Sequence, residues 1–217
     1  MSRFENLTLW YWPTACSLAC HIVLEETGLP YKEIKVDFAS GAQRQPDYLS
    51  INPKGRVPAL QVADGILTET PAILTYLAPA FRAALGQAES DALQSARELE
   101  FMCWLASTVH VAFAHISRAE RYATSPEAQA DVKRKGAESC RPLWQEIEAK
   151  LQGREWAMGE RYSVLDPYLQ VFWNWGKGER LGYDMEADFP VWTAHARRLC
   201  SRPAVSRVYA RAGLVAP

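Results

Sequence analysis

The sequence of 217 residues predicts a small α/β unit followed by an all-helical unit. Two observations lead to this prediction. Up to about residue 79, short apolar runs typical of strands alternate with helical patterns, in the order βαβ and then ββα. From about residue 88 onward, the patterns are helical. A strand–helix–strand order predicts parallel strands with a helical crossover, and the ββ step adds an antiparallel hairpin to the same sheet.

The α/β unit begins with a predicted strand over Leu7–Trp12, which Pro13 closes. A helix follows over Ser17–Thr27, with Gly28 and Pro30 as stop signals. The remaining elements are, in order, a strand over Tyr31–Val36, a loop over Asp37–Pro46, a short turn or helix, a strand over Ala59–Val62, a tight turn over 63–65, a short strand at Ile66 and Leu67, and a helix beginning near Thr70.

The helical unit follows a predicted linker over Pro79–Gln87. Its first helical stretch, over residues 91–123, contains neither glycine nor proline. The pair Ser163 and Asp166 has the spacing of a capping box, which we interpret as folding information rather than catalysis. The other predicted helices cover Glu127–Leu151, residues 163–178, and residues 189–214, the last split at Arg202 and Pro203.

The composition is that of a globular protein, with 48 % hydrophobic and 23 % charged residues. A net charge of −1 predicts neither a nucleic-acid nor a membrane partner. Five scattered cysteines do not form a disulfide framework, and no signal peptide is visible. No apolar run approaches the roughly 20 residues that a membrane helix needs. We therefore expect a cytoplasmic location, where free thiols persist.

The segment WYWPTACSLACHIVLEE, over residues 10–26, places two cysteines near the start of the first helix. Cys16 lies at the first turn, where free N–H groups and the helix dipole stabilise an anion. This position predicts a depressed pKa and a reactive thiol, but a buried, inert cysteine fits the same pattern. The C-x-x-x-C spacing differs from that of dithiol oxidoreductases, so we interpret Cys20 as a core residue. Tyr11, at the end of the strand, could donate a hydrogen bond to a sulfur or only pack.

Two further segments could bind a ligand with backbone atoms. Pro58 stands directly before a strand, which fits either a cis bond or an edge-strand proline. A cis bond would turn the Val57 backbone outward, where it could pair with an extended ligand. Thr70 and Pro71 are typical of an N-cap and a first helical residue, and Glu69 precedes them. This helix start could hold an α-amino acid head group, or Thr70 could simply cap the helix.

The histidines and tryptophans of the helical unit are weaker candidates. His110 and His115 are five residues apart and do not share a helix face, and no zinc-binding spacing occurs, so we expect no structural zinc site. His110 alone fits a packed histidine as well as a catalytic one. Trp173 and Trp175 fit either the core or a pocket lining.

The order of these motifs resembles the cytosolic glutathione transferases over nearly the whole chain. The residues that carry the resemblance are YWPTACS, NPKGRVPAL, LTET, the helical second half and the Ser163–Asp166 box. The first motif is most similar to that of the bacterial beta class. The resemblance implies a thioredoxin-like, glutathione-binding domain over residues 1–79 and an all-helical domain over residues 88–217 that forms the electrophile pocket, in a homodimer.

The resemblance also implies roles for individual residues. Pro58 would be cis, the Val57 backbone would pair with the cysteinyl part of glutathione, and Glu69 and Thr70 would hold its γ-glutamyl head. Cys16 would lie beside the glutathione sulfur with Tyr11 near it. The first long helix would supply a polar residue at the position of Cys103 and a histidine, His110. The expected pocket walls are Trp12, Val111, His115 and Trp173.

The sequence departs from the family pattern at several positions. The family often has a lysine after the second strand that reaches glutathione, for which only Gln43 or Arg44 could substitute here. Cys103 stands where the family has an asparagine, and Val111 where it has a lysine after the histidine. These changes bear on polar contacts between the helices and do not touch Val57, Glu69 or Thr70.

Three functions remain open from the sequence. The first is transfer of glutathione, as co-substrate and without a metal, to a small hydrophobic electrophile. The second is reduction of a disulfide or peroxide, with Cys16 as the nucleophile through a mixed disulfide. The third is a non-catalytic glutathione-binding module, because a fold alone does not fix a function.

Overall fold

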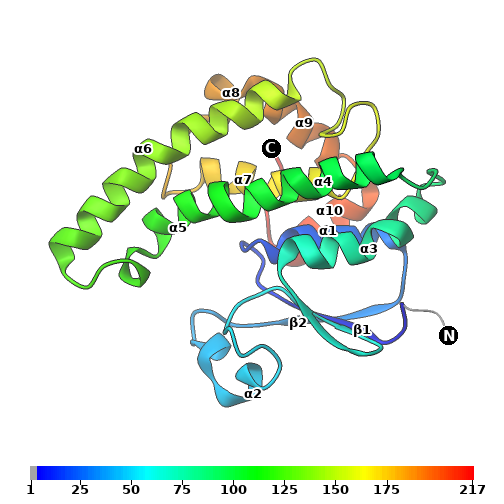
Figure 1. The fold of residues 1–217 in the computed structure, drawn as a ribbon, viewed down its shortest axis with the longest axis horizontal. Coiled ribbons are helices and arrows are strands. Elements are labelled where there is room, and N and C mark those ends of the chain that lie inside the picture. Colours follow the sequence, from blue (N-terminus) through cyan, green and yellow to red (C-terminus); the bar gives the residue numbers. More distant parts are fainter. Residues whose placement is uncertain (1–3) are drawn as a thin grey trace.

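The computed structural model of the chain describes residues 4–217 and divides them into a sheet layer and a helical layer (Figure 1). The sheet has four strands, β1 (Leu7–Tyr11), β2 (Tyr31–Lys35), β3 (Ala59–Val62) and β4 (Gly65–Thr68), in the order β2-β1-β3-β4. β1 and β2 are parallel, whereas β3 is antiparallel to both β1 and β4. The predicted βαβ and ββα arrangement is therefore confirmed, and the domain has a thioredoxin-like fold.

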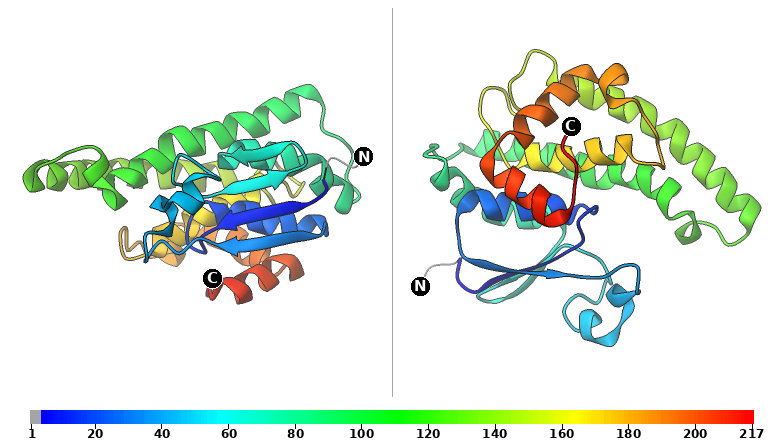
Figure 2. Two further views of the ribbon diagram at one scale, coloured as in Figure 1. Left: turned by 90° about the horizontal axis from the view of Figure 1, so that it is seen from below. Right: turned by 180° about the vertical axis from the view of Figure 1, so that it is seen from behind.

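Two helices cover one face of the sheet and separate it from the helical domain (Figure 2). They are α1 (Ser17–Thr27) and α3 (Thr70–Ala84), which pack against each other. The residues of β1 alternate as a pleated strand requires, with Leu9 and Tyr11 in the core under these helices and Trp10 on the opposite face. On that opposite face lie the 3₁₀ turn η1 (Ala42–Arg44) and the short helix α2 (Pro46–Leu49).

The predicted linker over residues 79–87 is largely wrong, because α3 continues through Pro79 to Ala84. Proline removes one backbone hydrogen bond from a helix. The helix nevertheless continues because residues on both sides of Pro79 are buried in the core, among them Leu74, Leu77 and Phe81. The connection between the two domains therefore covers only about residues 85–91.

The helical domain contains α4 (Ala92–Trp104), α5 (His110–Ser117), α6 (Pro126–Leu151), α7 (Leu165–Lys177), α9 (Pro190–Cys200) and α10 (Pro203–Ala212). A π-helical segment, Leu105–Val109, joins α4 to α5, and a 3₁₀ turn, η3 (Ala119–Arg121), follows α5. A short helix, α8 (Met185–Asp188), was not predicted. The all-helical second domain and its split at Arg202 and Pro203 are confirmed.

The continuous helical stretch Ala92–Ser117 corrects one expectation from the sequence. By length and composition it is apolar enough to cross a membrane, although no such run was expected. In the fold it packs against α3, α6 and α7 as part of the helical domain. Only 33 % of its most apolar window is buried within the chain, so much of its apolar surface faces outward.

Candidate active site

The loop between β1 and α1 places Cys16 at the edge of the interface between the two domains. Ser17 holds this loop closed, because its hydroxyl donates to the Trp12 carbonyl and accepts from the Trp12 N–H, both at 3.0 Å. Cys16 occupies the N-cap position of α1, as the sequence predicted. Its thiol donates to the Val57 carbonyl oxygen, with the two atoms 3.5 Å apart.

The electrostatics of Cys16 differ from the expectation. Burial raises the pKa of the Cys16 thiol, and a hydrogen bond with the Thr70 side chain only partly counteracts this effect. The predicted depression of the pKa is therefore wrong, because desolvation of the thiolate outweighs the helix N-terminus. Cys20 is fully buried as predicted, and burial raises the pKa of its thiol well above the ordinary value.

The segment before β3 presents its backbone in a fixed conformation. The peptide bond between Val57 and Pro58 is cis. The carbonyl oxygen of the preceding Arg56 accepts hydrogen bonds from the Tyr48 hydroxyl at 2.7 Å and from the Asn52 amide at 2.6 Å. These two side chains, neither of which the sequence analysis selected, hold the chain that leads into Val57.

The start of α3 lies next to the same thiol. The N-cap residue is Glu69 rather than Thr70, with a positive φ of 73° and no side-chain capping bond. Thr70 is buried, and its side chain forms a hydrogen bond with Cys16 instead of capping the helix. The Glu69 carboxylate accepts a hydrogen bond from Lys54 Nζ at 2.6 Å. The structure therefore brings Cys16, Val57, Glu69 and Thr70 together from three separate segments.

A cavity of about 1090 Å³ opens in front of Cys16 and Val57, between the two domains. The sheet domain contributes Trp12 and the η1 turn, including Gln43 and Arg44, to its walls. The helical domain contributes one face of α5 and the following turn, the C-terminal half of α7, and the segment over residues 213–215. The two residues proposed to substitute for the family lysine, Gln43 and Arg44, therefore both reach the cavity.

His110 lines this cavity from the start of α5, in contact with the Trp175 ring at 4.8 Å between centroids. Burial and the neighbouring positive charge of Arg118 lower the pKa of His110 to about 4. The imidazole is therefore neutral at pH 7 and can accept as well as donate a hydrogen bond.

Four other predicted residues lie elsewhere. Tyr11 is buried and its ring packs against His21, with centroids 4.7 Å apart, on the α1 side of the sheet. Trp173 is buried and donates to Thr193. Val111 is on an exposed face of α5, and His115 packs against Tyr122. None of these four residues lines the cavity.

Val111 and His115 do not line the cavity because a different face of α5 points into it. The cavity face of α5 carries His110, Phe113, Ala114 and Ser117, which is the spacing of one helix face. The π-helical segment Leu105–Val109 adds a residue to the turn before α5, so the faces of α5 are offset from those of α4. Trp175 and not Trp173 reaches the cavity from α7, and its Nε1 donates to the Thr14 carbonyl oxygen at 2.9 Å.

The predicted capping box at the start of α7 is present only in part, because the N-cap residue is Val164 and the Ser163 hydroxyl accepts from the Leu165 N–H at 3.2 Å. The Asp166 carboxylate accepts from the Ser163 N–H at 2.7 Å and from the Ser163 hydroxyl at 3.1 Å. It also accepts from the Ala157 N–H at 2.7 Å, and its Oδ1 lies 2.8 Å from His195 Nε2. Within residues 4–217, no group of three or more histidine, cysteine or acidic side chains is arranged to hold a metal ion.

In the thioredoxin-like domain, a cis-proline segment faces a thiol at a helix start. This domain is joined to a helical domain across a large cavity. The combination defines the class of glutathione-binding proteins. Comparison with known proteins gives the family. Residues 5–79 match the family model of the glutathione S-transferase N-terminal domain. Glutathione S-transferase GstA of Escherichia coli O157:H7 is 30 % identical over 213 residues, covering 96 % of this chain and all of that protein.

The chain belongs to the glutathione S-transferase family and is an enzyme of that family. The solved structure of a glutathione transferase homologue from Sulfitobacter with bound glutathione has a TM-score of 0.87 and 38 % identity, covering 97 % of this chain and 99 % of that one. A bacterial beta class transferase from Sphingomonas chungbukensis has a TM-score of 0.80 and 34 % identity, covering 96 % and 100 %. The predicted family resemblance is thus confirmed.

A further relative has a different named activity. Disulfide-bond oxidoreductase YfcG of Escherichia coli K12 is 28 % identical over 218 residues, covering 96 % of both chains.

Proposed function

We propose that the protein conjugates glutathione with small hydrophobic electrophiles, as a detoxifying enzyme of a bacterial cytoplasm. The observation that carries this proposal is the position of Cys16 and the Val57 backbone in the wall of one large cavity shared by both domains. Residues 1–79, of which 1–3 lie outside the described residues, would bind glutathione, and residues 88–217 would form the electrophile pocket. The similar solved structure from Sulfitobacter with bound glutathione supports glutathione as the thiol substrate.

The proposed binding mode uses the residues gathered around Cys16. The Val57 backbone would pair with the cysteinyl unit of glutathione, since strand-like backbone pairing is a recurrent mode of peptide binding. The Glu69 carboxylate would bind the ammonium group of the γ-glutamyl unit. The N-terminus of α3, together with Thr70, would bind the carboxylate of the same unit. Because Lys54 contacts Glu69, glutathione would share or displace that ion pair.

The proposed chemistry follows from the position of the glutathione sulfur. The N-terminus of α1 would lower the pKa of the glutathione thiol, with Cys16 beside it. The thiol proton passes to solvent, and the thiolate attacks the electrophilic carbon to form a C–S bond. In a substitution the leaving group departs with its bonding electron pair. In an addition the π electron pair moves to the neighbouring atoms of the acceptor, which then takes up a proton. The apolar rings of Trp12, Phe113 and Trp175 would pack against the electrophile. Neutral His110 could assist at the sulfur or at the leaving group.

A thermal-shift titration with glutathione and S-methylglutathione tests the binding step. We expect both to raise the unfolding midpoint, and glutathione to be conjugated to 1-chloro-2,4-dinitrobenzene. Glu69→Gln should weaken glutathione binding by roughly tenfold, since it removes the charged partner of the ammonium. Arg134→Gln, on the far side of α6, is the matched control. If neither glutathione nor S-methylglutathione shifts the midpoint, this binding mode and both enzymatic functions are wrong.

A second candidate function is glutathione-dependent reduction of disulfides or peroxides through Cys16, as the named activity of YfcG suggests. In that reaction the Cys16 thiolate attacks a disulfide, expels one thiolate and forms a mixed disulfide, which a glutathione thiolate then resolves. Cys16→Ala should abolish disulfide reduction if this function is correct. Under the first proposal the same variant would retain conjugation. If both activities are absent while glutathione still binds, the protein is a non-catalytic glutathione-binding module.

We also propose that the protein is a homodimer. The helical stretch Ala92–Ser117 carries the exposed apolar side chains Leu93, Leu99 and Val111 (67 %, 42 % and 37 % exposed). Partly exposed apolar surface on a long helix is typical of a subunit interface. Leu99→Glu should shift the sedimentation profile from about 49 kDa, twice the chain mass of 24.4 kDa, toward the monomer. A monomeric wild-type protein would contradict this proposal.

A further inference from the structure

The cavity in front of Cys16 has an unusual charge balance. Six cationic side chains line it, Arg44, Arg56, Arg118, Arg121, Lys177 and Arg180, against two carboxylates, Glu120 and Glu179. The whole chain, in contrast, has a net charge of −1. Positive charge is therefore concentrated where substrates would bind, and its field would attract anions into the cavity.

The five arginines of the cavity also differ from the other arginines in their partners. Among residues 4–217, none of the five has a carboxylate within ion-pair distance or a side-chain hydrogen bond. Every other arginine within residues 4–217 has one or the other; these are Arg82, Arg97, Arg134, Arg141, Arg154, Arg161, Arg197, Arg198, Arg202, Arg207 and Arg211. In the described part of the chain, the arginines without a side-chain partner are therefore those of the cavity.

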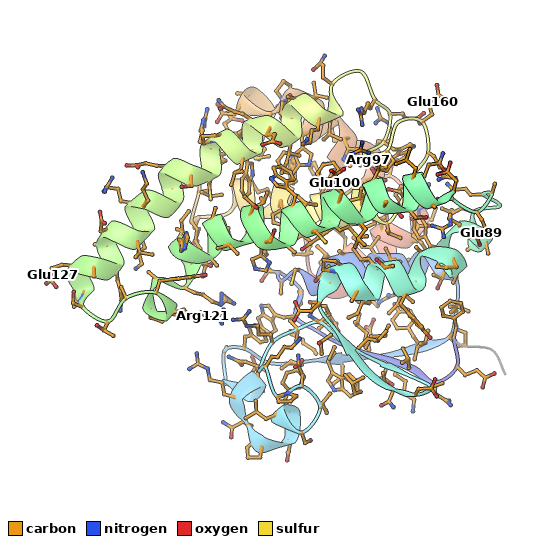
Figure 3. All side chains as sticks on the ribbon, viewed as in Figure 1. Glu89, Arg97, Glu100, Arg121, Glu127 and Glu160 are labelled. Atoms are coloured by element: carbon orange, nitrogen blue, oxygen red, sulfur yellow. The ribbon has the colours of Figure 1, made fainter. Side chains whose placement is uncertain are left out.

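Arg118 is the centre of this group. It is half-buried, just after α5, while Arg56, Arg121 and Arg180 are exposed around it. Burial and the charge of Arg180 lower the pKa of Arg118. The pKa of Arg121 is lowered by its partial desolvation and by the charges of Arg118 and Arg56. Such mutual repulsion is relieved when an anion binds between the guanidinium groups. Figure 3 shows Arg121 reaching from the helical domain toward the sheet domain.

Glutathione alone does not account for the whole group. Arg44 and Arg56 come from the sheet domain, next to Gln43 and Val57, where the proposed glutathione site lies. Glutathione has two carboxylates, and one of them accompanies its own ammonium at Glu69 and Thr70 in the proposed binding mode. Arg118, Arg121 and Arg180 belong to the opposite wall, contributed by the helical domain. They face the part of the cavity that the second substrate would occupy.

We propose that the electrophile conjugated by this protein carries an acidic group, such as a carboxylate, which binds to Arg118 and Arg121. The proposal rests on the proposed glutathione transferase function and names its substrate class. Planar guanidinium groups bind carboxylates through two parallel hydrogen bonds, and this contact would orient the electrophilic carbon toward the thiolate. An apolar pocket without these arginines would favour the neutral amide over the acid, because burying an unpaired carboxylate costs more than burying an amide.

Two matched substrates test this proposal, 4-chloro-3,5-dinitrobenzoate and its carboxamide. In both, the glutathione thiolate forms a C–S bond at the carbon that loses chloride, and only the charge of the distant group differs. The measured quantity is kcat/KM for each, divided by its uncatalysed rate with glutathione. We expect the wild-type ratio of acid to amide to exceed one, and to fall about tenfold in Arg118→Gln and Arg121→Gln, because each removes a charge-assisted contact.

Two further variants make the test specific. Arg118→Lys keeps the charge but loses the planar fork, so its ratio should lie between those of the wild type and Arg118→Gln. Arg134→Gln removes the same charge from an exposed site on α6 and should leave the ratio at the wild-type value. The unfolding midpoint of each variant shows that it is folded.

The outcomes separate this proposal from the function on which it rests. If the enzyme conjugates both compounds and the ratio does not depend on Arg118 or Arg121, the electrophile has no acidic group at this site and the proposal is wrong. If these variants raise the KM for glutathione and leave the ratio unchanged, the arginines serve glutathione instead, which also overturns it. If neither compound is conjugated by any variant, the proposed transferase function fails first.

Discussion

The indole Nε1 of Trp175 donates a hydrogen bond to the carbonyl oxygen of Thr14, with the two atoms 2.9 Å apart. This bond joins α7 of the helical domain to the loop that positions Cys16. The same indole stacks on Phe113, with ring centroids 4.4 Å apart, and contacts His110. One side chain therefore fixes the thiol loop of one domain against the cavity face of the other.

Trp175→Phe should retain most of this packing and lose the hydrogen bond. We expect a loss of about 1 kcal/mol in the free energy of unfolding, measured in urea. We expect a larger effect on catalysis, a decrease in kcat/KM of roughly threefold to tenfold, because the loop would no longer be held against the cavity. Trp173→Phe, which breaks a bond to Thr193 away from the cavity, is the matched control. Equal catalytic losses in both variants would contradict a specific role for Trp175.

The reactivity of Cys16 should depend on pH in the direction that burial sets. Because burial raises the pKa of this thiol, alkylation by iodoacetamide should be slow at pH 7 and accelerate as the pH rises through 9. Thr70→Val should shift the profile to still higher pH, since the hydrogen bond with Thr70 lowers the pKa. The measurement uses a Cys103→Ser background, because Cys103 is exposed and the other three cysteines are buried. A rate that reaches its plateau below pH 8 would contradict the raised pKa.

Glu25 should make stability depend on pH at the acidic end. Burial alone would raise its pKa, but hydrogen bonds from Arg211, Arg207 and Tyr31 outweigh burial and lower it to about 2. The folded protein therefore releases this proton more readily than the unfolded chain. The resulting stabilisation is complete above about pH 4.5 and is lost as the pH falls toward 2.

The double variant Arg207→Gln, Arg211→Gln should remove this contribution, which we expect to be about 2 kcal/mol at pH 7 for a carboxylate that is 13 % exposed. Urea unfolding at pH 7, 4 and 3 gives the comparison. The difference in the free energy of unfolding between wild type and variant should become smaller as the pH falls. Arg134→Gln, whose ion pairs are exposed, should show a small effect at each pH. Glu25 lies on α1, and Arg207 and Arg211 lie on α10. If the difference in unfolding free energy did not depend on pH, packing between these two helices, and not charge, would be its source.

Local signals in the sequence were sufficient for most of the fold. The helix Ser17–Thr27 has the predicted bounds because Gly28 adopts the left-handed conformation that ends it, with a φ of 66°. The prediction failed where tertiary packing overrides local preference. Pro79 is typical of a helix end, but the buried residues around it keep α3 helical. The π-helical segment before His110 likewise has no glycine or proline to indicate it.

The candidate site could be predicted only where the family motif specifies it. The motifs locate Cys16, Val57, Glu69 and Thr70, and the structure brings these residues together. The partnerless arginines could not be found in this way, because Arg56, Arg118 and Arg180 lie in three connections far apart in the sequence. Whether an arginine has a carboxylate partner depends on the packing of other elements, which no local pattern encodes.

Asp166 should be the acidic residue whose loss most strongly destabilises the helical domain. Its carboxylate is fully buried and contacts two backbone N–H groups, the Ser163 hydroxyl and His195 Nε2. Asp166→Ala would leave the two buried N–H groups, those of Ala157 and Ser163, without partners. We expect a loss of about 3–5 kcal/mol in the free energy of unfolding.

The conservative variant separates hydrogen bonding from shape. Asp166→Asn keeps the side-chain size and one carbonyl acceptor, so it should cost less than Asp166→Ala, about 1–3 kcal/mol. His195→Ala in each background tests the coupling, because its effect should be smaller once Asp166 is absent. Urea unfolding at pH 7 gives all four free energies. If Asp166→Asn and Asp166→Ala were equally destabilising, the charge of the carboxylate would be the main source of stability at this helix start. If the effects of Asp166→Ala and His195→Ala were simply additive, the contact between these two residues would contribute nothing to the stability of the domain.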